Sequence, residues 1–393
     1  MRHSVPLFAA VVLLIGCGGT APALRSAGAG SPNALARFLD RPVSPRHLDA
    51  VSDSTRSTTG APGPRYWTQF TDYTLRARLF PDEKRLQGTG QIVYHNRSPH
   101  HLFSIHLELS LNLHAPGVVR NEAVEVGRAM RLTRVAIDGV ELTKDATTGP
   151  RYAVNGTSLV VIPGRPIASG SETTLGLEWS VDLPAHGAGG RMGHDRDELF
   201  FLAYWYPTVS VYDDVDGWFT DPFRGSAEFY HGFGNYDVTI EAPQEWVVHA
   251  TGSLLNGEEI LSPEIVQRLR RAGESDQPVR ILDEDAFDGG ATLADSGETV
   301  AWRFRAEQVP DFSFSATRHS LWDAARAPVG DVNGDGATDY TLMHAVYRTN
   351  APLWQQVVGF GQHALRFLSD YTGLPYPWPH MTAVEGTPIE TGG

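Results

Sequence analysis

The alternation of apolar and polar residues changes character at about residue 66. Beyond that point, segments alternate with a period of two, which is typical of β-strands that bury one face. Gly, Asn and Pro lie between these segments, where short connections are needed. The sequence therefore predicts a mainly β fold, a two-layer β-sandwich. The expected strands are 73–80, 86–94, 102–113, 130–137, 152–162, 173–181, 199–203, 236–241, 246–254 and 299–305.

Two helices interrupt this pattern. Ser262 and Pro263 have the residue types of an N-cap and a first helical position, and they predict a surface helix that runs to about Arg271. The acidic, Gly-rich segment 274–297 that follows is expected to be a loop insertion. A second helix is expected from about 351 to 371, begun by Asn350 and ended by Gly373.

The second helix belongs to a segment, 308–393, that predicts an incomplete α+β unit. A short strand is expected at 381–384, and shorter alternating runs lie around 312–314 and 342–347. A helix with one apolar stripe needs a partner, so we expect apolar area to be left exposed in this chain. The stripe consists of Leu353, Val357, Phe360, Ala364, Phe367 and Leu368.

The amino terminus has the pattern of an exported lipoprotein. Arg2 precedes an apolar core at 5–15 that is too short to span a bilayer, so residues 1–16 are expected to be a signal peptide. The segment 14–17 resembles a bacterial lipobox, and it predicts lipidation of Cys17 and anchoring to a membrane of the bacterial cell envelope. Residues 17–64 are rich in Gly, Ala, Ser, Thr and Pro and predict a flexible tether.

Composition narrows the function classes. The 393 residues carry a formal net charge of −14, so a nucleic-acid partner is not expected. Cys17 is the only cysteine, which excludes an internal disulfide and an all-cysteine zinc site.

Three stretches carry a family resemblance. The first contains Trp-Tyr-Pro at 205–207 and Tyr-Asp-Val at 236–238, the second contains Ala-Thr-Gly at 250–252, and the third is the Gly-Gly pair at 392–393. Together they resemble the membrane alanyl aminopeptidase family, the gluzincin zinc aminopeptidases. The resemblance implies that 65–307 is the amino-terminal sandwich of that family and that 308–393 begins its thermolysin-like catalytic domain.

The resemblance also implies a chemistry that this chain does not complete. Family members hold zinc with His-Glu-x-x-His and a further Glu, and a Gly-Gly-Met-Glu strand borders their peptide substrate. None of the 15 histidines here is followed by Glu, so no catalytic or zinc residue is assigned. By resemblance, Glu390, Gly392 and Gly393 would border the substrate. Some relatives bind the substrate amine with a Glu in the stretch where this chain has Tyr-Trp-Tyr at 204–206.

A separate motif at 331–339 follows the logic of a calcium loop. Oxygen-bearing residues at alternate positions and a Gly at the sixth suit a hard cation. The twelfth position is Leu342 instead of the bidentate Glu of an EF-hand, so a metal-free acidic turn remains the alternative. The candidate calcium residues are Asp331, Asn333, Asp335, Ala337 and Asp339.

Other polar residues fit structural roles. Asp213, Asp214 and Asp216 lie beside a Gly, where a solvated turn is expected in preference to an acid–base pair. His249 and His344 lie on apolar strands and are expected to be packed core residues.

The leading hypothesis is therefore the amino-terminal portion of a lipid-anchored zinc metallopeptidase, expected to be inactive alone. Its complete form would hydrolyse peptides from their amino terminus. The alternative is a non-catalytic surface lipoprotein that uses the sandwich as a binding or scaffold module.

Overall fold

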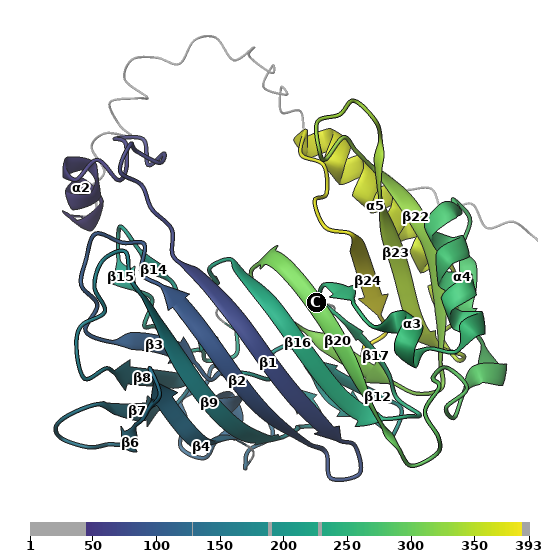
Figure 1. Ribbon diagram of the computed structural model, residues 1–393, viewed down its shortest axis with the longest axis horizontal. Helices are drawn as coiled ribbons and strands as arrows, with labels where there is room; N and C mark the ends of the chain where they lie inside the picture. Colours follow the sequence, from purple (N-terminus) through teal and green to yellow (C-terminus); the bar gives the residue numbers. More distant parts are fainter. Residues whose placement is uncertain (1–44, 128, 188–190, 227–229, 387–393) are drawn as a thin grey trace, which may run out of the picture.

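The computed structural model describes residues 45–127, 129–187, 191–226 and 230–386 (Figure 1). The described chain is mainly β and forms several sheets, which confirms the predicted fold class. The largest sheet has eight strands in the order β18-β20-β16-β1-β2-β9-β4-β5. Their bounds are Ser253–Leu254, Thr299–Val309, Gly234–Pro243, Phe70–Phe80, Arg85–His95, Glu172–Asp182, Met130–Ile137 and Val140–Glu141.

The period-two pattern of the sequence becomes a sheet with one buried face. On β1, Tyr73, Leu75, Ala77 and Leu79 are buried, and the residues between Tyr73 and Leu79 are exposed. The buried face shares one core with residues of two smaller sheets, such as Leu107, Leu159 and Phe200. This packing is the second layer of the predicted sandwich.

The two smaller sheets have five strands each. One has the order β10-β11-β12-β21-β17, with bounds His186–Gly187, Met192–Asp195, Leu199–Leu202, Phe314–Thr317 and Val247–Ala250. The other has the order β13-β3-β8-β7-β6, with bounds Thr208–Val209, Ile105–Glu108, Ser158–Ile162, Arg151–Asn155 and Thr143–Lys144. A short ribbon pairs β14 (Tyr212–Asp213) with β15 (Gly217–Trp218).

Three predicted strands were too long. The segment 102–113 forms β3 and then a 3-10 helix, η1 (Ser110–His114), whose five residues are all buried. Because both faces of η1 lie in the core, its leucines could not reveal a strand period. The segment 152–162 is a hairpin, β7 and β8, and 246–254 is divided into β17 and β18. Gly156 and Gly252, with φ of +59° and +83°, make these two turns.

A four-stranded sheet forms the second part of the fold, in the order β19-β22-β23-β24. Its strands are Val279–Leu282, Ser320–Gly330, Asp339–Arg348 and His380–Val384, with β24 parallel to β23. β24 confirms the short strand predicted at 381–384. The prediction that 274–297 is a loop insertion was wrong in part, because the segment contains β19 and a 3-10 helix, η3 (Glu284–Ala286). β22 gave no alternating pattern because both of its faces are largely buried.

Helices cover one face of this second sheet (Figure 1). α4 (Pro263–Glu274) confirms the helix predicted after Ser262, and it follows the short helix α3 (Gly257–Ile260). The predicted helix 351–371 is divided into η4 (Pro352–Gln356) and α5 (Val357–Thr372), which ends at Gly373 with φ +69° as expected.

The helix α5 leaves apolar area exposed, as the sequence predicted. Val358 and Leu365 are buried, whereas Phe360, Phe367 and Leu368 are 62%, 53% and 54% exposed. The buried side packs on β22 and β23 around Met343. Most of the predicted stripe therefore lies on the side of α5 that faces away from its own sheet.

The described end of the predicted tether is more ordered than its composition indicated. Residues 45–52 form α2 (Pro45–Ser52), and Arg56 forms a bidentate ion pair with the buried carboxylate of Asp214 at 2.7 Å. The predicted sites at Cys17, Glu390, Gly392 and Gly393 lie outside the described residues. None of the helices that the structure describes is long and apolar enough to cross a membrane.

The two parts of the fold exchange strands across residue 307, where the sequence analysis divides them. β19 precedes that point but pairs with β22 of the second sheet. β21 follows it but lies between β12 and β17 of the sandwich. Residues of both parts, such as Trp302 and Trp322, belong to one core cluster.

Candidate functional site

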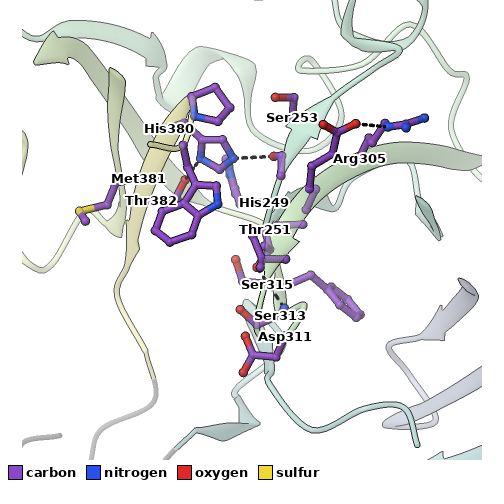
Figure 2. A pocket seen from close by; sticks show the side chains of 18 of the residues that line it. His249, Thr251, Ser253, Arg305, Asp311, Ser313, Ser315, His380, Met381 and Thr382 are labelled. Carbon is purple, nitrogen blue, oxygen red and sulfur yellow. Dashed lines mark hydrogen bonds and ion pairs between the residues drawn. The ribbon is translucent and has the colours of Figure 1, made fainter. Parts of the chain in front are cut away.

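A cleft of about 790 Å³ lies between the sandwich and the second sheet (Figure 2). One wall comes from the β17–β18 turn, β20 and residues 309–315, and the other from residues 376–384 around β24. Clefts between two structural units are common ligand sites. The polar lining residues are His249, Thr251, Ser253, Arg305, Glu307, Asp311, Ser313, Ser315, His380 and Thr382, and the apolar walls include Phe201, Phe314, Tyr376 and Trp378.

The stretch 204–206 holds the sandwich wall of the cleft in place. Trp205 is fully buried, and its indole N–H donates a hydrogen bond to the carbonyl of Phe312 at 3.0 Å. The hydroxyl of Tyr206 accepts a hydrogen bond from the backbone N–H of Phe312 at 3.2 Å. Both backbone groups of Phe312 are therefore fixed by two adjacent side chains, those of Trp205 and Tyr206. Asp311 and Ser313, which line the cleft, flank this anchored residue.

The Ala-Thr-Gly turn at 250–252 forms the opposite end of the same wall. Gly252 has φ +83°, and a Cβ there would lie 2.3 Å from the backbone oxygen of Arg305. Its own carbonyl accepts a hydrogen bond from Nε2 of His380 on β24. Only glycine fits this position, and its carbonyl connects the two walls of the cleft.

Three histidines and a tryptophan lie together at the inner end of the cleft. The ring of His249 meets that of Trp322 edge to face at a centroid distance of 4.7 Å. Nε1 of Trp322 donates a hydrogen bond to Nδ1 of His344 at 3.0 Å, and the ring centroids of His344 and His380 are 5.7 Å apart. His249 and His344 are both buried, as the sequence predicted.

The surroundings keep these histidines neutral. Burial, with a smaller contribution from His380, lowers the pKa of His249 to about 3. Burial and the two neighbouring imidazoles place the pKa of His344 well below its usual value. Burial also lowers the pKa of His380, although its hydrogen bond to Gly252 opposes this. Neutral imidazoles each offer one hydrogen-bond donor and one acceptor.

An ion-pair cluster on Arg348 connects the two parts a second time. The guanidinium of Arg348 pairs with Asp195 of β11 and with Glu385, which lies 2.9 Å away just after β24. The backbone N–H of Arg348 also donates to Glu385 at 2.7 Å. The side chain of Arg348 is only 10% exposed, so these contacts are shielded from water and hold residue 385 in place.

The carboxylate of Asp311, which lines the cleft, and the buried carboxylate of Glu108 lie on either side of His231. Burial raises the pKa of Asp311, although His231 and Arg191 oppose that shift. His231 has one ring nitrogen 3.9 Å from Asp311 and the other 3.8 Å from Glu108. Glu108 is 6% exposed, and within the described residues neither of its carboxylate oxygens has a hydrogen-bond partner.

The candidate calcium residues lie in the loop between β22 and β23 and do not line the cleft. Asp331 accepts hydrogen bonds from the backbone N–H groups of Gly334, Asp335 and Gly336, and Asp339 accepts one from Val332. These bonds hold the loop between β22 and β23 closed on itself. The sequence prediction of calcium remains a prediction.

The three aspartates at 213–216 lie at the turn between β14 and β15, as predicted, but the turn is not wholly solvated, because Asp214 is buried against Arg56. Asp213 accepts hydrogen bonds from the N–H groups of Val215 and Asp216 and from the hydroxyl of Tyr230. Asp216 pairs with Arg46 on the surface. Each carboxylate is engaged in holding the chain, which leaves no acid–base pair here.

Sequence reasoning did not single out Asp311, Ser315 or His380. Polar residues alternate at 249, 251 and 253 and again at 311, 313 and 315, so each set occupies one face of an extended segment. That signal was present, but only the pairing of β17 with β21, which places His249 opposite Ser315, shows that the two faces meet.

Zinc does not fit the residues that are present. In the described ranges, no three or more His, Cys, Asp or Glu side chains are grouped so that they could hold a metal ion. His344 accepts from Trp322, and both ring nitrogens of His380 have partners. The histidine cluster is therefore a packed, hydrogen-bonded group.

No protein-family model and no curated protein sequence matches the chain. Among solved structures, the chain is similar to the M1 zinc metallopeptidase from Deinococcus radiodurans, at 13% identity and a TM-score of 0.48. It is also similar to a mutant of that enzyme bound to a Tyr-Ser-Ala substrate, at 13% identity and a TM-score of 0.46. A third similar structure is a two-domain M1 zinc metallopeptidase mutant bound to L-tryptophan, at 14% identity and a TM-score of 0.46.

Each of these similarities covers 82% of this chain and 57 to 58% of the solved chain. This chain thus spans less than two thirds of the length of those structures. At such identities and TM-scores, the similarities do not assign a family or an activity to this chain.

Proposed function

We propose that this chain is the amino-terminal part of a lipid-anchored zinc metallopeptidase whose complete form removes residues from the amino terminus of peptides. The observation that carries the proposal is where two of the family-like stretches lie. Trp205 and Tyr206 anchor one side of the cleft wall, and Gly252 forms the other. Residues that resemble an aminopeptidase family therefore build the same cleft, although they are distant in sequence.

In this proposal the chain supplies a binding surface and the catalytic metal is held elsewhere. The zinc ligands would come from polypeptide that is not part of residues 1–393, because this chain has no His-Glu-x-x-His. In this proposal the chain forms the cleft between its sandwich and its second sheet. The Arg348 cluster and the His380–Gly252 hydrogen bond fix the position of β24 against the sandwich.

Lipid attachment at Cys17 would place the cleft outside the cytoplasmic membrane of a bacterium. It rests on the lipobox-like segment 14–17 alone. A peptide in the cell envelope would then be the substrate.

The test starts from the protein as its own cells make it. We would isolate it with an antibody against residues 65–307 and measure its mass, its zinc content and its hydrolysis of alanyl-p-nitroanilide. We expect a polypeptide longer than 393 residues with stoichiometric zinc and activity that a chelator abolishes.

The purified 393-residue chain is the control, and it should contain no stoichiometric zinc and show no hydrolysis. A native protein of 393 residues without zinc would contradict the proposal and favour the scaffold lipoprotein. One tightly bound zinc in the 393-residue chain would contradict the ligand argument.

A further inference from the structure

Two polar side chains on the sandwich wall of the cleft lack partners within the described residues. Ser315 is 2% exposed, and its hydroxyl has no hydrogen-bond partner. His249 is 8% exposed, and within the described residues no hydrogen bond to either of its ring nitrogens is found. They lie opposite each other on β21 and β17 and both line the cleft (Figure 2). Buried polar groups without partners are uncommon, and they call for an explanation.

The position of His249 is fixed by packing. Its ring lies edge-on against Trp322, whose indole N–H is held by His344. Ser315 lies in the middle of a strand that is paired on both sides. A ligand that meets these two groups therefore finds them already positioned, which reduces the entropy lost on binding.

The charges around the cleft limit the class of ligand. Arg305 is the cationic side chain of the lining, and Glu307 pairs with it at 2.9 Å. Asp311 lies on the same extended segment as Ser315. In Figure 2 it is at the opposite end of the sandwich wall from Arg305. Among the described lining residues, a phosphate or carboxylate ligand would find no cation that is not already paired. A ligand that is uncharged along most of its length and positively charged at one end is favoured instead.

The backbone amide of a ligand has the hydrogen-bonding groups that His249 and Ser315 need. Its N–H needs an acceptor and its C=O needs a donor, and a neutral imidazole beside a hydroxyl provides both. Phe314, Tyr376 and Trp378 offer apolar walls for side chains next to that amide.

We propose that the cleft binds an extended peptide, with His249 and Ser315 holding one of its backbone amides and Asp311 pairing with a positively charged group. The choice of a peptide among amide-bearing ligands rests on the proposed function. This site belongs to the sandwich and needs no metal, so it can be tested by binding alone.

The test uses the purified chain and a fluorescein-labelled peptide, Lys-Ala-Phe-Ala-Leu-Gly, in fluorescence anisotropy titrations. Replacing His249 by Phe keeps the ring on Trp322 but removes both nitrogens, and Ser315→Ala removes the hydroxyl. We expect each change to weaken binding about five- to tenfold, the usual effect of losing one or two hydrogen bonds. A peptide that carries Glu in place of Lys should bind more weakly, and Asp311→Asn should remove that difference.

The matched control is His106→Phe. His106 is also a partly buried histidine on a sandwich strand, and burial lowers its pKa, but it bonds to Ser104 outside the cleft. The His106→Phe substitution should leave the affinity for the peptide unchanged. Melting temperatures measured on all variants identify any variant that fails to fold.

The inference is wrong if the peptide does not bind, or if the His249 and Ser315 variants bind it as the parent does. It is also wrong if a trimer of N-acetylglucosamine, a ligand whose amides do not belong to a peptide, binds and the peptide does not. If the complete protein hydrolyses peptides but this chain does not bind them, this inference is wrong and the proposed function is supported. If this chain binds the peptide but the complete protein contains no zinc, the inference is supported and the proposed function is wrong.

Discussion

Gly252 allows the sharpest test of how the cleft is built. Its φ of +83° disfavours any other residue, and an added Cβ would lie 2.3 Å from the carbonyl oxygen and 2.6 Å from the carbonyl carbon of Arg305. Both atoms belong to the backbone of β20, in the interior of a paired sheet, so they cannot move aside as a side-chain tip would. We expect Gly252→Ala to be strongly destabilising.

The size of the effect follows from two separate contributions. A left-handed conformation costs a residue with a side chain about 1–2 kcal/mol, and overpacking a rigid site costs about 1–3 kcal/mol more. Gly252→Ala should therefore lower the free energy of unfolding by about 2–5 kcal/mol. Gly297 is the matched control, because its φ is +87° but nothing lies within 4 Å of its missing Cβ. Gly297→Ala should show only the conformational contribution, about 1–2 kcal/mol.

Urea unfolding followed by tryptophan fluorescence measures both variants against the parent chain. Because His380 donates to the carbonyl of Gly252, the variant should also loosen β24, which proteolysis near residue 380 would report. Equal destabilisation by the two substitutions would refute the clash with β20. It would mean that backbone conformation alone explains why glycine occurs at position 252.

Four other predictions test separate features. The folded chain keeps His249, His344 and His380 neutral below their usual pKa of 6.5, where the unfolded chain binds protons, so the free energy of unfolding should fall as pH drops from 6.5 toward 3, by up to about 1.4 kcal/mol per pH unit per histidine. Urea midpoints at several pH values should show that slope, and His249→Phe should reduce it; an unchanged slope would contradict the neutral state of His249. Millimolar calcium should slow proteolysis within 331–339, and Asp335→Ala should abolish the protection if the loop binds the ion. Cys17→Ala should move the cellular protein out of the detergent phase, and unchanged membrane partitioning would refute the lipobox. Chymotrypsin should cut at the exposed Phe360, Phe367 or Tyr371 of α5 before it cuts the eight-stranded sheet, unless a partner covers that helix.

The sequence predicted those elements in which a single face is buried. β1, β2, β9 and β16 alternate cleanly, because one side of the large sheet meets the core and the other meets solvent. β22 and η1 are buried on both sides, so hydrophobicity alone carried no period from which to place them. β19 was hidden within an acidic segment, since its four residues are too few to stand out.

The candidate site was less predictable than the fold. His249 could be placed on an apolar strand, but its sequence neighbours do not show that Ser315 lies opposite or that His380 approaches from another sheet. These relations depend on pairing between strands that are far apart in sequence. Trp205 and Tyr206 were noticed as part of a resemblance, and the structure adds a physical role, because they hold both backbone groups of Phe312.

The strand exchange across residue 307 affects how this chain can be divided. A fragment that ends there loses β21, so β12 and β17 have no strand between them and β19 has no β22 to pair with. The division interrupts two sheets, the one that contains β21 and the one that pairs β19 with β22, and it would also open the shared core around Trp302 and Trp322. We therefore expect the two parts to be coupled in folding: heat or denaturant should melt them in one transition, and insertions or domain swaps at residue 307 should be poorly tolerated.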